Sequence, residues 1–275
     1  MNKCSPMRIA AVFLGLYLAA MPAYCLFRVF QVQAGVMLLT FAMPLLMSAF
    51  AIAHMVGQYG WRTGVGMTLS AIGISLGAEV LGVSTGWLFG DYVYTDQLGP
   101  KAFGFVPWLI PFAWLMVLYP AWELTKYEMM ADGSKSTFTF HPSSFAFHPF
   151  LAALAVTAYD LSLDPRMVAD GNWIWHGGGF YFGIPFSNFV GWFITAWVIF
   201  VVWGRLIGLR EAKTHRSLTS IMPVWAYLVL WIGETIANIF FWSGPVVGLI
   251  VFGAMGLFAM PVLWRWQFGK ATQEK

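Results

Sequence analysis

Charged side chains are scarce in this sequence of 275 residues. It has 15 basic and 12 acidic side chains, or 10% of the chain, against about 25% in soluble domains. So few charges cannot cover a water-facing surface of this size, which excludes an ordinary soluble domain, a disordered chain and a nucleic-acid-binding protein. The two cysteines, Cys4 and Cys25, stand at opposite ends of one apolar stretch. A helix would separate them by about 30 Å, so a disulfide scaffold is excluded as well.

Apolar residues are abundant instead, at 59% of the chain, and 18% of the residues are aromatic. A helix needs about 20 mostly apolar residues to cross the hydrocarbon core of a bilayer. Eight stretches reach roughly this length: residues 9–27, 35–57, 64–89, 103–122, 146–163, 180–204, 219–241 and 245–264. The sequence therefore predicts an all-α protein, a polytopic integral membrane helix bundle of about eight transmembrane helices. These helices form a single transmembrane domain over residues 1–275.

The assignment of spans has an alternative interpretation at each end of the chain. Only the short turn at residues 242–245 separates the last two stretches, so seven spans are the alternative to eight. The first stretch follows Lys3 and Arg8, as the apolar part of a signal peptide would. Its length of about 19 apolar residues and the lack of a clear cleavage site favour a retained helix.

Lysine and arginine are unevenly divided between the two sides of this arrangement. With eight spans, twelve of them fall on the side of the two termini, and only Arg28, Lys101 and Arg166 fall on the other. Loops on the cytoplasmic side carry the excess of Lys and Arg. Both termini are therefore expected in the cytoplasm, and the chain is expected to cross the cell (inner) membrane several times. A seven-span chain would leave the basic C-terminus outside.

Ionisable and amide side chains inside the predicted spans are candidates for function, because each is costly in a bilayer. They are Glu79, Asp160, Asp164, Asn188, Glu234 and Asn238. By the predicted orientation all six fall in the outer half of the membrane, where they would form an acidic pocket with aromatic walls. Pro165 is expected to end the fifth helix directly after Asp164. The alternative is that Glu79, Glu234 and Asn238 only bond helices to one another.

Several kinds of chemistry lack the residues that they need. The seven lysines lie at the termini or in loops, which excludes a Schiff base within a span, and the five histidines are not clustered as a di-iron or shared metal site requires. Residues 177–179 are three glycines, but they do not stand between a strand and a helix as a dinucleotide site would need. We therefore expect no cofactor and no metal. Asp160 and Asp164 could instead hold Mg²⁺ on a diphosphate, as in a prenyltransferase, but no comparable second acidic motif is present.

A long, ordered series of motifs lies in the middle of the chain, at residues 79–86, 89–95, 98–100, 106–107, 110–114, 160–165, 171–175, 181–185 and 188–192. In these motifs the sequence resembles the carotenoid biosynthesis membrane-protein family. The resemblance covers residues 75–195. The family includes hydratases of the carotenoid 1′,2′ type, such as γ-carotene 1′-hydroxylases and bisanhydrobacterioruberin hydratases. The resemblance implies an enzyme that adds water to the terminal double bond of an acyclic carotenoid end and so forms a tertiary alcohol.

This reaction suggests roles for the polar residues. The expected proton donor is one of Asp160, Asp164 and Glu79, with Asp160 favoured. Glu79 and Glu234 would tune the donor or activate the water, and Asn188 and Asn238 would orient that water. The expected wall around the cation is formed by Tyr92, Tyr94, Trp175 and Tyr181.

The expected partners are a carotenoid within the lipid bilayer and other enzymes of the same pathway, with no nucleic acid. Two other functions remain open. One is a different carotenoid-end enzyme, an isomerase or a prenyltransferase. The other is a carotenoid-binding or transport protein without enzymatic activity.

Overall fold

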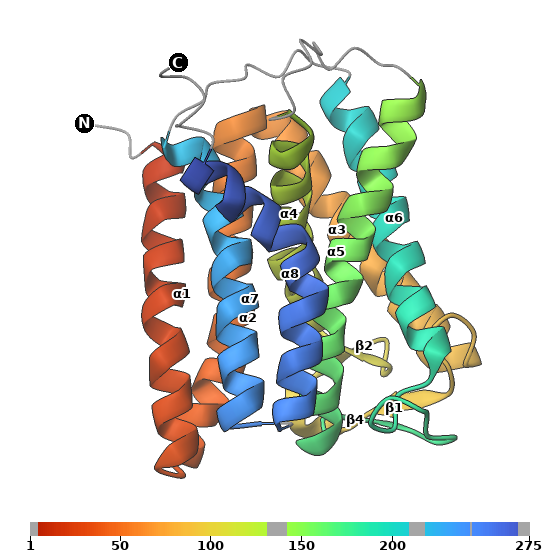
Figure 1. The fold of residues 1–275 in the computed structure, drawn as a ribbon. Coiled ribbons are helices and arrows are strands. Elements are labelled where there is room, and N and C mark those ends of the chain that lie inside the picture. The colour runs from red at the N-terminus through yellow and green to blue at the C-terminus, as the bar shows by residue number, and fades with distance from the viewer. Residues whose placement is uncertain (1–4, 131–141, 209–217, 243, 269–275) are drawn as a thin grey trace.

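The computed structural model describes residues 5–130, 142–208, 218–242 and 244–268. Within them the chain forms eight long helices that pack side by side (Figure 1). They are α1 (Pro6–Val29), α2 (Gln33–Tyr59), α3 (Trp61–Thr85), α4 (Ile110–Met130), α5 (Pro142–Ala169), α6 (Phe186–Gly208), α7 (Met222–Phe240) and α8 (Pro245–Phe268). A 3₁₀ turn, η2 (Leu218–Ile221), precedes α7. Each predicted span corresponds to one helix, which confirms the predicted all-α bundle.

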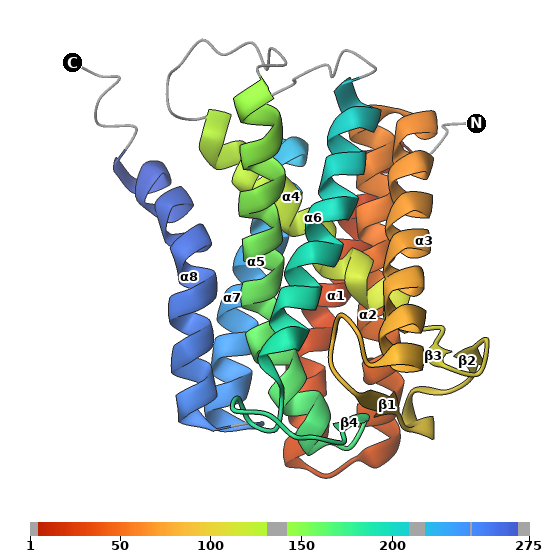
Figure 2. The same cartoon turned by 90° about the vertical axis from the view of Figure 1, so that its right-hand side faces the viewer.

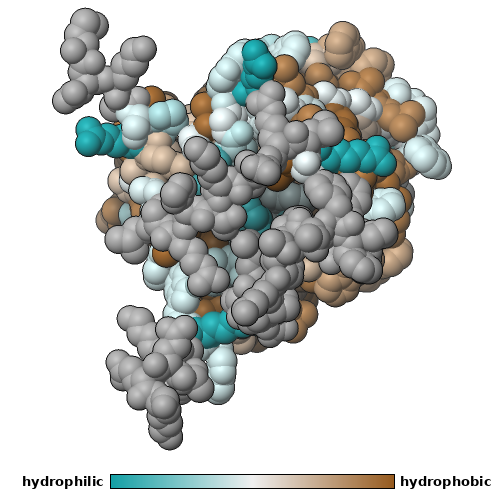
Figure 3. All heavy atoms as spheres, turned by 90° about the horizontal axis from the view of Figure 1, so that it is seen from above, coloured by the Kyte–Doolittle hydropathy of each residue, from teal (hydrophilic) through white to brown (hydrophobic). Residues whose placement is uncertain are grey.

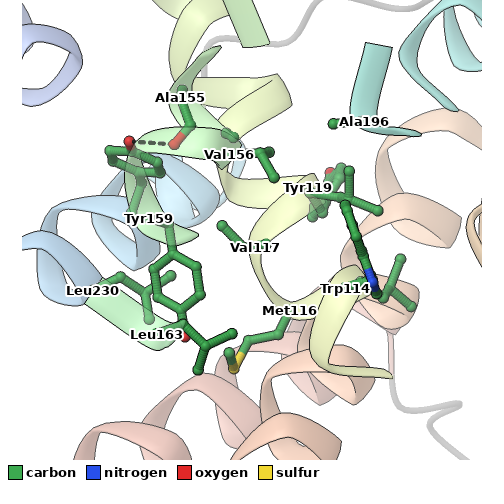
Figure 4. Close-up of a cluster of buried hydrophobic side chains, with 14 of the residues drawn as sticks. Trp114, Met116, Val117, Tyr119, Ala155, Val156, Tyr159, Leu163, Ala196 and Leu230 are labelled. Carbon is green, nitrogen blue, oxygen red and sulfur yellow. Dashed lines mark hydrogen bonds between the residues drawn. The ribbon is translucent and has the colours of Figure 1, made fainter. Parts of the chain in front are cut away.

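Six of the helices, α1, α2, α3, α6, α7 and α8, are long and apolar enough to cross a membrane by themselves. The chain is thus a multi-pass membrane protein. Helices α4 and α5 carry more polar residues and lie among the others. In α4 every residue from 114 to 125 is buried, and Figure 4 shows its side chains packed against Tyr159 and Leu163 of α5. Helix α4 is therefore shielded from lipid by the other helices, whereas α5 exposes Phe147, Phe150 and Leu154 on the outside of the bundle.

Both ends of the helical chain lie at the same end of the bundle (Figure 1). Helix α1 begins there, with the Ser5 hydroxyl accepting a hydrogen bond from the Arg8 amide and Pro6 in the first turn. Helix α8 ends there. Viewed from this end, hydrophilic side chains appear on the face and apolar ones around much of its edge (Figure 3). The even number of spans accounts for this arrangement.

Two small antiparallel sheets cover the opposite end of the bundle (Figure 2). Strand β1 (Tyr92–Tyr94) pairs with β4 (Trp173–Trp175), and β2 (Lys101–Ala102) pairs with β3 (Val106–Pro107). A 3₁₀ turn, η1 (Asp96–Leu98), lies between β1 and β2. Because side chains alternate along a strand, the first and last residues of β1 and β4 all point inward and are buried.

Three predicted spans reached into this covering layer and were too long there. Helix α3 ends at Thr85, because Gly86 takes the left-handed conformation (φ 68°) that ends helices. Helix α4 begins at Ile110 and α6 at Phe186, so the preceding apolar residues form strands and loops. Apolar residues that close a bundle end cannot be told from span residues by hydropathy alone.

The predicted end of the fifth helix at Pro165 was wrong, because α5 continues to Ala169. A proline inside a helix leaves the carbonyl four residues earlier without its amide donor. That carbonyl belongs to Leu161, and it accepts a hydrogen bond of 2.9 Å from the Tyr181 hydroxyl. The loop after β4 thus supplies the missing donor and allows the helix to pass through the proline.

Candidate active site

A cavity lies inside the bundle beneath the β1–β4 sheet. It holds about 940 Å³ of unfilled space, counting the part that opens to the surroundings. Seven of the residues predicted from the sequence line it: Glu79, Tyr92, Tyr94, Asp164, Trp175, Asn188 and Glu234. The other three, Asp160, Tyr181 and Asn238, are buried behind the lining. The acidic pocket predicted from the sequence is therefore present as a group of neighbouring side chains.

Glu79 on α3 is held by three hydrogen-bond donors. The Tyr92 and Tyr94 hydroxyls both donate to Oε2, the latter at 2.8 Å, and the Trp114 indole donates to Oε1 at 2.8 Å. Burial, and next the charge of Glu79, raise the pKa of Tyr92 and Tyr94 well above the ordinary value. Both tyrosines are thus neutral donors, and Glu79 is fixed as an acceptor.

Asp160 and Asp164 form a second group with Asn188 of α6. They are one turn apart on α5, and the Asn188 amide nitrogen donates to Oδ2 of both, at 2.9 Å for Asp160. Because one amide nitrogen donates to both, the two carboxyl groups lie side by side. In the described part of the chain, Oδ1 of Asp160 has no partner. Asp164 faces the cavity, while Asp160 lies behind it.

Glu234 on α7 belongs to a third group, which lies nearer to α1. Its Oε2 accepts a hydrogen bond of 2.7 Å from the Ser162 hydroxyl and lies 3.7 Å from Nη1 of Arg166. The Asn238 amide donates to the Ser162 oxygen at 2.7 Å. The Arg166 guanidinium lies over the Trp242 ring, 4.1 Å from its centroid. This group joins α5 to α7 across the wall of the cavity.

Aromatic rings form much of the remaining wall. Trp114 of α4 stacks on Trp192 of α6, with ring centroids 3.9 Å apart and an angle of 21°. Tyr92 stacks on Trp175 at 5.5 Å, and both line the cavity. These packed rings make the wall apolar and exclude water, so the wall suits an apolar end group.

The sequence did not identify five residues of the site: Trp114, Ser162, Arg166, Trp173 and Trp192. Arg166 was counted among the loop charges because the helix was expected to end at Pro165. In the structure it is buried and lies one turn after Ser162 on α5. If the helix had been predicted to continue past Pro165, Arg166 would have been placed on the same helix face as Ser162. For the tryptophans no sequence signal separates the cavity wall from lipid-facing positions.

In the ranges that the structure covers, no three or more His, Cys, Asp or Glu side chains are grouped as a metal site would be. Of the histidines, His141 and His215 lie outside the described residues. His54 contacts the Tyr119 hydroxyl and the Thr219 carbonyl, at 2.6 and 2.7 Å.

The fold and the cavity define a multi-pass membrane protein with an acidic internal site and aromatic walls. The chain belongs to the carotenoid biosynthesis protein family, which matches residues 35–257. It is similar to bisanhydrobacterioruberin hydratase from Haloarcula japonica, with 29% identity over 209 residues. That match covers 74% of this chain and 64% of the relative, so the chain spans less than two thirds of the relative's length. No solved structure matches it.

Proposed function

We propose that this chain is a hydratase of carotenoid biosynthesis. It adds water across the terminal double bond of an acyclic carotenoid end group and forms a tertiary alcohol. The observation that carries the proposal is the Asp160–Asp164 pair, whose two carboxyl groups share the Asn188 amide as a donor at the edge of an aromatic-walled cavity. Membership of the family and the name of the Haloarcula relative support the same reaction.

The carboxyl pair is suited to donate a proton. Two buried carboxyl groups that share one donor cannot both be charged without a large cost, so one of them is expected to keep its proton. Asp164 is the member that faces the cavity, so we assign the transfer to Asp164 and the sharing of the proton to Asp160. Glu79, which accepts from three donors, is not the donor in this proposal.

The reaction proceeds in two steps that together add one water. The acid gives its proton to the less substituted carbon of the double bond, whose π electrons form the new C–H bond and leave a tertiary cation. A water oxygen then bonds to the cation, and its spare proton returns to the carboxylate pair. The aromatic faces of the wall and the carboxylates stabilise the cation between these steps.

Glu234 and Glu79 have supporting roles. Glu234 lines the cavity, and its carboxylate, held by the Ser162 hydroxyl, is the group that we propose binds the water. Glu79 fixes Tyr92, Tyr94 and Trp114, and with them part of the aromatic wall. Asn238 orients Ser162, and Tyr181 supports the helix that carries the acids.

The prenyltransferase alternative is disfavoured by the position of Asn188. Its amide nitrogen donates to both aspartates and occupies the place between them where a shared Mg²⁺ would be bound. An isomerase and a carotenoid carrier remain as outcomes of the experiment below. We place the protein in the cell (inner) membrane with cytoplasmic termini, beside other carotenoid enzymes from which it receives its substrate.

The test is mass spectrometry of the pigments in a host that makes lycopene or γ-carotene, with and without the chain. A product heavier by one water, with a tertiary hydroxyl at the acyclic end, is expected. Asp164→Asn and Asp160→Asn should each lower hydration by about 10²-fold or more, as loss of a general acid does. Asp96→Asn, on an exposed loop side chain, is the matched control and should retain activity.

Unchanged pigments in both hosts, with well-expressed protein, would contradict hydration of these substrates. Pigment bound at unchanged mass would then point to the carrier. Full hydration by Asp164→Asn would contradict the assignment of the proton donor.

A further inference from the structure

An apolar groove lies on the surface of the bundle between α1 and α7. It is lined by Pro22, Cys25, Leu26 and Val29 of α1 and by Ile236 and Ala237 of α7, among others, and holds about 950 Å³ of unfilled space that opens outward. Leu26 is 55% exposed and Ile236 47%. Since this surface faces lipid in a membrane protein, the groove is open to the hydrocarbon core and not to water.

The groove adjoins the cavity and is connected to it through shared lining side chains. Four side chains line both of them: Tyr24, Met43, Glu234 and Trp242. At this junction Tyr24 meets Trp242 edge-on, with ring centroids 6.0 Å apart, while Arg166 lies over the Trp242 ring. A molecule in the groove would therefore reach Glu234 and the polar cavity without crossing another helix.

A neighbouring groove on the same two helices lacks this connection. It is lined by Leu18, Leu228, Val229 and Ile232, among others, and shares no lining residue with the cavity. Met21, Pro22 and Gly233 line both grooves, and a Cβ atom on Gly233 would lie 2.0 Å from the end of Met21. The two helices therefore pack closely at the border between the connected groove and the second one.

We propose that the groove between α1 and α7 binds the apolar chain of the isoprenoid substrate. The substrate enters sideways from the bilayer, its end group lies in the cavity, and the rest of the chain stays in the groove. This inference rests on the proposed function. The occupant is an apolar chain because the groove is apolar up to its junction with the cavity, and because that junction leads to the acids that act on the end group.

Cys25 provides a measurement that does not depend on turnover, because it lines the groove. In a Cys4→Ser variant it is the sole cysteine, and its alkylation by N-ethylmaleimide is followed in liposomes with and without lycopene. Lycopene should slow the alkylation of Cys25 several-fold. The matched control carries Ile232→Cys in a Cys4→Ser, Cys25→Ser background, and its alkylation should be unchanged. Equal rates with and without lycopene at Cys25 would mean that only lipid occupies the groove, which overturns the proposal.

A second pair of variants tests the groove by turnover. Ile236 and Ile232 are one turn apart on α7 and similarly exposed, 47% and 42%, but only Ile236 lines the connected groove. Ile236→Trp should raise the KM for lycopene several-fold with little change in kcat, and Ile232→Trp should resemble the wild type. Identical behaviour of the two variants would overturn the groove while leaving hydration intact. If the wild type does not hydrate at all, the proposed function fails, and Cys25 protection still decides the groove.

Discussion

Arg166 of α5 and Glu234 of α7 face each other across the cavity wall, with Nη1 and Oε2 3.7 Å apart and both side chains at most 10% exposed. Both charges are removed from water, so each depends on the other and on its remaining contacts. Glu234 has the Ser162 hydroxyl, and Arg166 has the face of Trp242. The pair connects the helix that carries the acids to the helix that borders the groove.

Removing one member of this pair should destabilise the protein more than removing both. Arg166→Gln or Glu234→Gln leaves a buried charge without its partner, which costs about 3 kcal/mol or more. In the double variant the loss should be well below the sum of the single losses. Unfolding of the purified protein in detergent measures the three variants, and additive losses would contradict a direct pairing.

The Asn188 amide should matter for catalysis, because it contacts both carboxyl groups. A hydrogen bond to a charged group contributes about 1.5–3 kcal/mol, so Asn188→Ala should lower kcat by roughly 10- to 100-fold. Asn172→Ala is the matched control, since its amide contacts the Met167 sulfur outside the carboxyl pair. Hydration of lycopene in membranes compares the two, and equal activities would argue against a positioning role for Asn188.

The Tyr181 hydroxyl should stabilise α5 only because Pro165 is present. Tyr181→Phe leaves the half-buried Leu161 carbonyl without a donor and should cost about 1 kcal/mol. Pro165→Ala restores an amide that can bond to that carbonyl within the helix. Tyr181→Phe should therefore cost less in the Pro165→Ala background. A cost that is the same in both backgrounds would mean that the hydroxyl acts elsewhere.

Two neighbouring glycines should respond very differently to alanine. A Cβ atom on Gly179 would lie 2.0 Å from the Ile184 carbonyl carbon, which is backbone and cannot move aside. No atom lies within 4 Å of the corresponding position on Gly177. Gly179→Ala should lower the thermal stability strongly and reduce the amount of folded protein, whereas Gly177→Ala should be close to neutral. Equal stability of both variants would contradict the close packing of this loop.

The number of helices and most of the cavity could be predicted from the sequence, because a bilayer makes both apolar length and buried polarity conspicuous. Glu79 and Asn188 were identified for this reason. Their partners were not, because Trp114 meets Glu79 through packing of α3 against α4, which hydropathy does not encode. The orientation of the termini stays a prediction. The resemblance to the family was recognised over residues 75–195, which is a shorter range than the family match over residues 35–257.

The covering sheet and the polar helices impose an order on biosynthesis. A membrane chain is made from its N-terminus onward, and an aspartate within an inserting helix is costly, by about 2.5–3.5 kcal/mol at the helix centre and less toward the end, where Asp160 and Asp164 lie. Helix α5 carries Asp160 and Asp164, but the side chain that donates to them, Asn188, lies on α6, which is made later. The partner of Ser162 is Glu234, which lies 72 residues further along the chain. The Trp175 indole likewise donates a hydrogen bond to the Phe89 carbonyl, which lies 86 residues earlier in the chain. Helix α5 therefore depends on later helices for its place in the membrane, and a chain truncated before α6 should fail to retain it there.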